Sequence, residues 1–238
     1  MTFLPVILWS DALIWLLVFA AALLGALSAR NPPLRTAWRR VGRSRPGMVA
    51  ATVLAAFVLV GLLDSLHYRP RLESRETDQQ AVYAIEVLSV LDAVATPLRT
   101  RNEKTYSPPL ATRAYAKEAI EVRAADGSLR QTRDFPRLRH GGRHLENEAR
   151  RDADIARRVL VAELLATLVF AGLAVGCAGL WARRNGCSVP QAARVLWRGE
   201  TDFAWRAVLA TLGVMLLLLL PVAVLCVDYH VFGTDKVG

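Results

Sequence analysis

Apolar residues along this chain are gathered into four long blocks, which polar and basic stretches separate. The blocks are Ala12–Ala29, Met48–Leu66, Val159–Trp181 and Ala207–Val227, and the apolar character of the first extends upstream to Phe3. Crossing about 30 Å of hydrocarbon takes about 20 mostly apolar residues in a helix, because each residue advances the helix by about 1.5 Å. The pattern therefore predicts four transmembrane helices, the first of which can begin as early as Phe3.

The polar segment between the second and third blocks, His67–Arg158, is predicted to form a small domain of its own. Asp78–Ala95 places apolar residues on one face at helical spacing, which indicates an amphipathic helix. Ile120–Arg133 is expected to form a β-hairpin, because Asp126 and Gly127 suit a tight turn between its two halves. Loops are expected at two further places, Pro108-Pro109 and Gly141-Gly142.

The predicted fold class is an all-α membrane protein, with four transmembrane helices and a small mixed α/β extracytoplasmic domain between helices 2 and 3. The domain organisation follows from the four blocks. The expected parts are residues 1–66 (helices 1 and 2), 67–158 (the extracytoplasmic domain), 159–227 (helices 3 and 4) and 228–238 (a short extracytoplasmic segment).

Arginine is concentrated in the two short loops that join paired blocks. The loop from Arg30 to Gly47 holds six arginines and no acidic residue, and the loop Ala182–Arg206 holds five arginines. Because short Lys/Arg-rich loops are retained in the cytoplasm, both loops are expected there, with residues 67–158 and both ends of the chain outside. A secretory signal peptide carries its positive charge before the apolar run, whereas Arg30 follows it, so the first block is interpreted as a retained helix.

The formal net charge of +9 over 238 residues is compatible with two functions of basic residues, nucleic-acid binding and membrane orientation. The arginines lie beside apolar blocks and no basic stretch is interleaved with aromatic residues, so membrane orientation is favoured and no nucleic acid is expected. The cysteines are Cys177, Cys187 and Cys226, and none lies in the polar segment, which excludes a disulfide framework there.

Candidates for catalytic or metal chemistry have simpler interpretations. His140 and His144 have the spacing of helical metal ligands, but the glycines between them break such a helix, so no metal is expected. No nucleophile motif or phosphate-binding loop occurs, so we expect no enzyme, no catalytic residue and no cofactor.

Three carboxylates lie near the expected outer helix ends and are interpreted as members of interfacial ion pairs, namely Asp11, Asp64 and Glu163. The expected partners are Arg69 and Arg71 for Asp64, and Arg157 and Arg158 for Glu163. A basic patch of Arg137, Arg139 and Arg143 with the two histidines is interpreted as a solvated surface, with anionic lipid or an acidic partner as the alternative.

The last nine residues, HVFGTDKVG, carry the most specific pattern in the chain. They resemble the H-x-[FL]-G-T-D-x-x-G segment of the oligopeptide and dipeptide ABC-importer permeases, with Val231 where proline is usual. The matching residues are His230, Phe232, Gly233, Thr234, Asp235 and Gly238. In that family the segment is extracytoplasmic and follows an N-terminal membrane helix, which agrees with the location expected from the arginines.

The resemblance implies the N-terminal part of a multi-pass permease subunit in the bacterial plasma (inner) membrane. Its implied partners are ABC ATPase subunits, a second permease subunit and an extracytoplasmic solute-binding protein, in addition to the lipid bilayer. Typical members reach this segment after one helix, so four helices and an outer domain indicate a variant with an enlarged N-terminal region. The loop that docks on the ATPase is expected downstream of Gly238, so the 238 residues alone are not expected to transport solute.

The alternative function is a membrane sensor or assembly protein without transport activity, whose extracytoplasmic domain binds a ligand or a partner. An enzyme is a third class without a supporting motif. The DNA downstream of codon 238 discriminates the first two, because a permease continues into an ATPase-docking loop and further helices.

Overall fold

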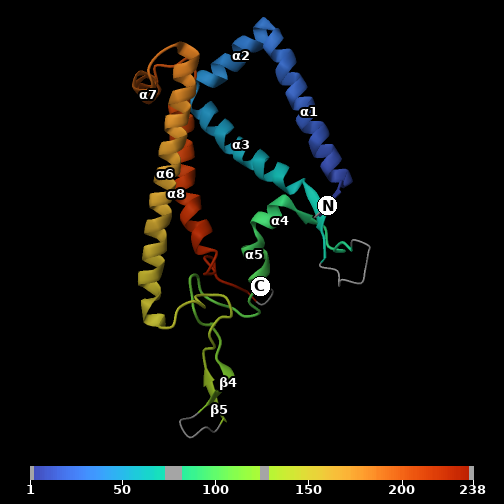
Figure 1. Cartoon of the computed structure of the whole chain (residues 1–238), viewed down its shortest axis with the longest axis vertical. Coiled ribbons are helices and arrows are strands. Elements are labelled where there is room, and N and C mark those ends of the chain that lie inside the picture. Colours follow the sequence, from blue (N-terminus) through green and yellow to red (C-terminus); the bar gives the residue numbers. More distant parts are fainter. Residues whose placement is uncertain (1–2, 73–81, 124–128, 236–238) are drawn as a thin grey trace. The chain divides into compact units, whose positions relative to one another are not determined.

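The computed structural model describes residues 3–72, 82–123 and 129–235, and most of them are helical (Figure 1). The chain divides into two compact units, and the division passes through two of the long helices. Unit 1 comprises Met1–Thr96 and Gly172–Leu212, and unit 2 comprises Pro97–Ala171 and Gly213–Gly238.

Within the described residues, four helices are long and apolar enough to cross a membrane, which confirms the four expected helices. They are α1 (Trp9–Arg30), α3 (Arg45–Asp64), α6 (Arg151–Asn185) and α8 (Trp205–Leu225). The first begins at Trp9 rather than at Phe3, because Phe3–Val6 forms the strand β1. The Asp11 carboxylate accepts a hydrogen bond from the Leu8 backbone N–H at 2.9 Å, and this contact fixes the start of α1.

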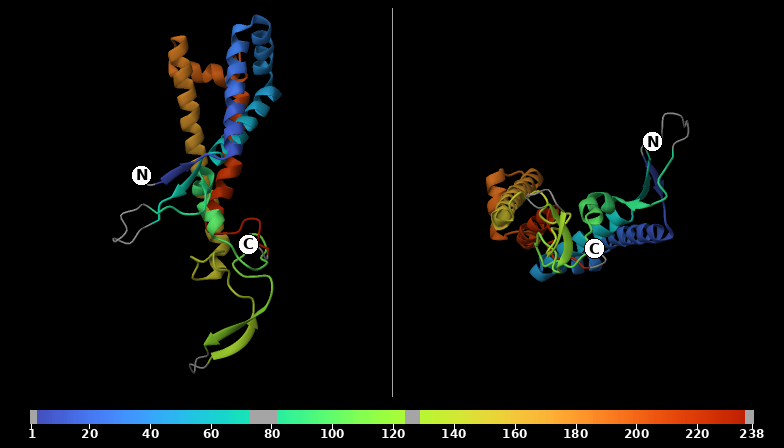
Figure 2. Two further views of the ribbon diagram at one scale, coloured as in Figure 1. Left: turned by 90° about the vertical axis from the view of Figure 1, so that its right-hand side faces the viewer. Right: turned by 90° about the horizontal axis from the view of Figure 1, so that it is seen from below.

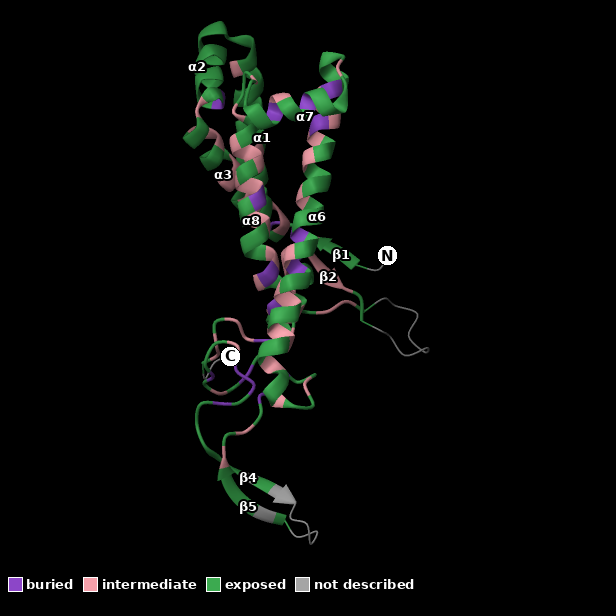
Figure 3. Cartoon of the chain, turned by 90° about the vertical axis from the view of Figure 1, so that its left-hand side faces the viewer, coloured by how far each residue is buried: buried purple, intermediate pink, exposed green. Residues whose placement is uncertain are grey.

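The long helices carry large apolar side chains on their surfaces instead of burying them in a core. Leu17 in α1 is 69% exposed, Phe57 in α3 is 72% exposed and Leu168 in α6 is 70% exposed. Figure 3 shows that exposed residues cover most of α1 and α3. Such surfaces are unfavourable in water but suit the hydrocarbon of a bilayer.

Each arginine-rich loop contains a short helix that was not predicted from the sequence. The first is α2 (Pro32–Arg43), which begins with proline, a residue that has no backbone N–H and so adds no unpaired donor to the first turn. The second is α7 (Val189–Arg198), which the left-handed Gly199 terminates at φ +73°. In unit 1, α7 packs on α6 through three alanines and one leucine, namely Ala178 and Ala182 of α6 with Ala192 and Leu196 of α7. Both arginine-rich loops are therefore largely helical.

A small antiparallel sheet in unit 1 has the strand order β1-β2-β3. Strand β2 (His67–Pro70) pairs with β1, so that Val6 lies opposite His67, and β2 also pairs with β3 (Leu88–Ser89). The sheet joins the residues before α1 to those after α3. It also brings His67 beside the start of α1.

The amphipathic helix predicted for Asp78–Ala95 is wrong within the described residues, and its first four residues lie outside them. The chain instead forms β3, then α4 (Val90–Val94) and α5 (Thr96–Thr100). Ser89 and Asp92 form a capping box, with Ser89 Oγ accepting from the Asp92 N–H at 3.0 Å and Asp92 Oδ2 accepting from the Ser89 N–H at 2.9 Å. This capping box starts a new helix at Val90. The apolar residues before Ser89 therefore do not belong to a continuous helix, although their spacing is helical.

Unit 2 holds the predicted hairpin, which consists of β4 (Glu118–Arg123) and β5 (Leu129–Asp134) in antiparallel register (Figure 2). The hairpin is confirmed, whereas its turn residues Asp126 and Gly127 lie outside the described residues. The predicted loop at Pro108-Pro109 and the predicted turn at Gly141-Gly142 are also confirmed, the latter with Gly142 at φ +64°.

A small apolar cluster of Ala111, Ala114 and Leu138 supports the loops of unit 2. Farther along, α6 and α8 approach closely, because a Cβ atom at Gly213 of α8 would lie 3.2 Å from the Phe170 ring of α6. The short helix η1 (Glu148–Arg150) leads into α6.

Candidate functional site

The segment that follows α8 lies against the loop around Ser107 in unit 2. Ser107 and Thr234 exchange two backbone hydrogen bonds, each 3.2 Å long, as an isolated antiparallel bridge. The Leu110 N–H donates to the His230 carbonyl oxygen at 2.9 Å. The motif residues from His230 to Thr234 are thus held by the backbone of a loop more than 100 positions earlier in the chain. Gly238 lies outside the described residues.

Gly233 occupies a position that only glycine fits. Its φ of +80° lies in the left-handed region, which side chains with a Cβ rarely adopt. A Cβ atom there would also collide with the carbonyl oxygen of Ser107. The glycine of the motif therefore lets two backbones approach each other, which is a structural role.

Thr234 adds a side-chain connection at the same place. Its hydroxyl donates to the Thr105 carbonyl oxygen at 2.6 Å, and Ser107 Oγ lies 2.9 Å from Thr234 Oγ1. A hydroxyl has one proton, so the hydroxyl of Ser107 is the donor in the second bond. Ser107 is buried, and both hydroxyls are satisfied within the protein.

His230 points toward the buried carboxylate of Glu103. His230 Nε2 and Glu103 Oε1 are 3.6 Å apart, and the side chains are 16% and 7% exposed. The same Glu103 oxygen accepts a hydrogen bond from the His140 backbone N–H at 2.5 Å. Burial lowers the pKa of the His140 side chain, and the nearby charges of Arg139 and Arg101 lower it further against the opposing effect of Glu103. His230 Nε2 is buried and has no hydrogen-bond partner among the described residues, so its approach to Glu103 is not a hydrogen bond.

The residues immediately before the motif form a charged network with the start of α6. Asp154 Oδ2 accepts from Tyr229 Oη at 2.9 Å and from Arg158 Nε at 2.8 Å, and it lies 2.8 Å from His144 Nε2. Arg158 also donates to Asp228 Oδ2 at 2.6 Å. Burial and the hydrogen bond to Asp154 raise the pKa of Tyr229 above its usual range. This network fixes the direction in which the chain leaves α8.

Phe232 differs from its neighbours because it is 84% exposed. The backbone contacts on either side of it, at His230 and Thr234, hold this apolar side chain outward. Asp235 also has an interaction partner. The arrangement contains no pair of a nucleophile and a base among the described motif residues, and its geometry suits presentation of a rigid surface.

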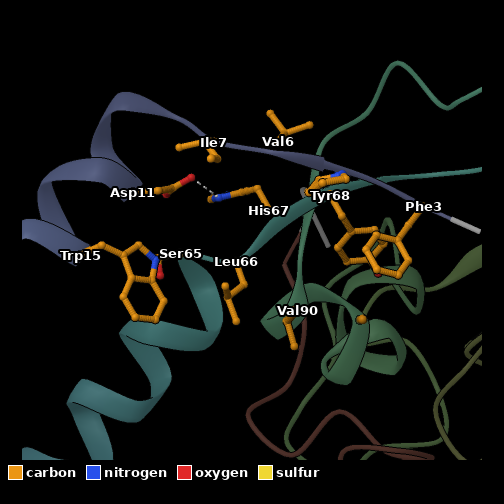
Figure 4. A pocket seen from close by; sticks show the side chains of 12 residues that line it. Phe3, Val6, Ile7, Asp11, Trp15, Ser65, Leu66, His67, Tyr68 and Val90 are labelled. Carbon is orange, nitrogen blue, oxygen red and sulfur yellow. Dashed lines mark hydrogen bonds and ion pairs between the residues drawn. The ribbon is translucent and has the colours of Figure 1, made fainter. Parts of the chain in front are cut away.

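A second candidate site lies in unit 1, where an apolar cavity of about 690 Å³ contains one polar pair (Figure 4). His67 Nδ1 lies 3.0 Å from Asp11 Oδ2, and the Asp11 side chain is only 4% exposed. Asp11 belongs to the first turn of α1, where the helix dipole favours a negative charge. The lining is otherwise mainly apolar, with Phe3, Val6, Ile7, Trp15, Leu66 and Val90 around the pair. Such a cavity suits an apolar ligand that carries one polar or cationic group.

The ion pairs expected for the three helix-end carboxylates differ from those observed. Glu163 makes no ion pair in the described part of the chain, because Arg158 and Arg157 contact Asp154 at 2.8 and 3.5 Å instead. Asp64 likewise makes none with a described residue, while Asp11 pairs with His67. The basic patch is partly neutralised as well. Arg137 Nε lies 3.2 Å from Glu148, and the ring of His144 lies beside Asp154.

Glu103, Asp154 and Tyr229 were not predicted from the sequence. The spacing of Asp154 and Arg158, four positions apart on one helix, is a signal that could have identified their pair. No local pattern distinguishes Glu103, because its partners His140 and His230 are distant in sequence.

Comparisons of the chain with protein-family models, with curated proteins and with solved structures find no significant match.

Proposed function

We propose that this chain is the N-terminal membrane region of a permease subunit of an ABC importer for peptides or similar solutes. The observation that carries the proposal is the segment from His230 to Asp235, which has the family pattern directly after the fourth apolar helix. Its pattern residues are also those with demanding local roles, since Gly233 has a positive φ and Thr234 bridges two loop residues.

The family resemblance implies a bacterial inner-membrane location, and the arginine distribution supports an extracytoplasmic position for residues 228–238. The exposed Phe232 then lies on the side from which a solute-binding protein delivers its cargo. Two further partners belong to this proposal, namely a second permease subunit and ABC ATPase subunits. The chain itself takes no cofactor and catalyses no reaction, and ATP hydrolysis by the partners would bias the conformational equilibrium of the assembled transporter.

Purification of the natural protein from its native membrane, through an affinity tag and under mild detergent conditions, tests the proposal. Mass spectrometry should identify an ATPase that carries a phosphate-binding GxxxxGK[ST] loop, together with a second multi-pass subunit. The ATPase activity of that complex should increase when a solute-loaded binding protein is added. A preparation that contains neither partner would refute the permease assignment.

The cavity at Asp11 and His67 favours the alternative, a membrane sensor or assembly protein that binds an apolar ligand. In that case the tagged protein should retain a small apolar molecule and signalling or assembly partners in place of an ATPase. Asp11→Asn would then abolish ligand retention, whereas in the permease the same change would leave the partner ATPase bound.

A further inference from the structure

A second cavity in unit 1 lies between α1 and α2 and has a volume of about 740 Å³. Its walls are an apolar stripe of α1 and a basic face of α2, and Phe203 contributes to its lining. The volume falls within the range of roughly 300–1,000 Å³ that is typical of ligand sites. The candidate functional sites described above use neither wall.

The α2 wall presents two guanidinium groups to the cavity. Arg35 and Arg39 both line it, and their separation of four positions places them on one face of α2. Within the described part of the chain, neither makes a side-chain hydrogen bond or an ion pair. The loop from Arg30 to Gly47 contains no acidic residue. The positive charge of this wall is therefore uncompensated by the described residues and favours an anion from outside the protein.

The α1 wall is apolar and open. The lining residues Ala21, Leu24, Gly25 and Ser28 follow one another at helical spacing, so they form a single stripe along α1. Three of them are small, and a Cβ atom placed at Gly25 would meet nothing within 4 Å. A flexible hydrocarbon chain fits such a stripe, because it can lie along the helix where no side chain intervenes.

Phe203 is held in the wall of the cavity by the end of α2. The Ala204 N–H donates to the Gly42 carbonyl oxygen at 2.8 Å, and the Phe203 ring packs directly on Gly42, where a Cβ atom would collide with it. Trp38, which is 59% exposed, lies on the same side of α2 as the two arginines. Tryptophan is typical of the boundary between hydrocarbon and headgroups, so this cavity has the residue types of a headgroup-level site.

We propose that the cavity between α1 and α2 binds an anionic phospholipid. The phosphodiester of the headgroup accepts hydrogen bonds from Arg35 and Arg39, because a guanidinium matches a phosphate in charge and in geometry. One acyl chain lies along the Ala21–Ser28 stripe of α1. The basic wall of α2 then binds the headgroup and the apolar wall of α1 binds the acyl chain. The phosphate supplies the counter-charge of the two arginines. Basic pockets beside membrane helices hold lipid headgroups by this chemistry in general.

Native mass spectrometry of the purified full chain tests this inference with two lipids of identical acyl chains, phosphatidylglycerol and phosphatidylcholine. We expect preferential retention of phosphatidylglycerol. The double variant Arg35→Gln/Arg39→Gln should bind it on the order of 25-fold more weakly, from a factor of about five for each arginine near a headgroup. Arg30→Gln/Arg40→Gln is the matched control, because it removes the same charge from residues that do not line the cavity. Equal losses in the two double variants would overturn the site.

The apolar wall is tested separately by Gly25→Leu, which fills the stripe with a side chain while all arginines remain. Gly61→Leu is its control, because Gly61 is also a helical glycine with open space around it and lies in α3, away from the cavity. We expect loss of bound phosphatidylglycerol in Gly25→Leu alone. Equal retention of lipid by both glycine variants, or displacement of the lipid by an excess of inorganic phosphate, would mean that no acyl chain is bound and would overturn the inference.

Discussion

The hydroxyl of Thr234 donates a hydrogen bond to the backbone carbonyl oxygen of Thr105 across 129 positions of the chain, at 2.6 Å. The same hydroxyl oxygen accepts from Ser107, so one small side chain connects two residues of the loop to the segment after α8. The threonine of the family pattern is therefore a structural connector. It makes the position of the segment dependent on a loop that the pattern does not include.

Thr234→Val should destabilise this connection, because valine keeps the shape of threonine but leaves the Thr105 carbonyl and the Ser107 hydroxyl without partners. The expected loss is about 1–3 kcal/mol of local stability, the typical cost of unsatisfied buried groups. Hydrogen exchange of the amides around Ser107, followed by mass spectrometry, measures it. Thr234→Ser retains the hydroxyl and should exchange nearly as slowly as the wild type. Similar fast exchange in both variants would argue against the hydrogen bond.

Gly233→Ala tests the close approach of the two backbones. Alanine at a positive φ costs about 1–2 kcal/mol by itself, and here its Cβ would also collide with Ser107. Gly186 is a matched control, because its φ is +65° and a Cβ atom there would meet nothing within 4 Å. Thermal unfolding in detergent should therefore show a larger decrease in Tm for Gly233→Ala than for Gly186→Ala. Equal decreases would show that the collision is relieved at no cost.

The stability of unit 2 should fall as the pH is lowered through the titration of His140. Its folded pKa is lowered by burial, so protonation favours the unfolded chain, in which the pKa is about 6.5. The neutral side chain contributes stability that is fully present above about pH 6.5 and is lost as the pH falls through the folded pKa. Thermal unfolding between neutral and mildly acidic pH measures this loss. His140→Gln should reduce the pH dependence, and an unchanged profile would contradict the assignment.

The four long helices could be predicted from sequence because hydrophobic length is a local property, and a helix satisfies its own backbone in hydrocarbon. The hairpin could also be predicted from the sequence, because its two strands are neighbours in the chain. In contrast, β1 pairs with β2 across the whole of α1 and α3, and no periodicity in Phe3–Val6 indicates such a partner. The Asp78–Ala95 prediction failed because the capping box at Ser89 outweighs a periodicity that extends over too few residues.

Only part of the candidate site could be predicted from the sequence, because its contacts also join residues that are distant in the chain. The pattern from His230 to Asp235 can be read directly, but its supports are Ser107, Thr105 and Glu103, which are far away in the chain. The helices α2 and α7 were missed because the arginine-rich loops were interpreted from their charge alone. Proline at the start of α2 and glycine after α7 are the signals that could have identified them.

Arg158 connects Asp154 and Asp228, so its loss should cost more than the loss of Tyr229 from the same network. Arg158→Met removes the cation that the two carboxylates share and leaves them only the longer contacts with Arg157 and Arg101, at 3.5 and 3.3 Å. We expect a loss of about 2–4 kcal/mol, somewhat below the cost of breaking a fully buried pair. Tyr229→Phe removes one of several donors to Asp154 and should cost about 1 kcal/mol. Chemical denaturation of the two variants measures the difference in the free energy of unfolding. Equal losses in the two variants would show that Arg158 contributes no more to the network than Tyr229 does.

The orientation of the chain is tested with one engineered cysteine at a time, in a variant in which Cys177, Cys187 and Cys226 are replaced by alanine. Thr36 lies exposed in the arginine-rich helix α2, and Thr132 lies exposed in the hairpin strand β5. Because short arginine-rich loops are generally retained in the cytoplasm, we expect an impermeant thiol reagent to label Thr132→Cys in intact cells and to label Thr36→Cys only after the membrane is opened. The reverse pattern would invert the topology. It would also place Phe232 on the cytoplasmic side, where no extracytoplasmic solute-binding protein could reach it.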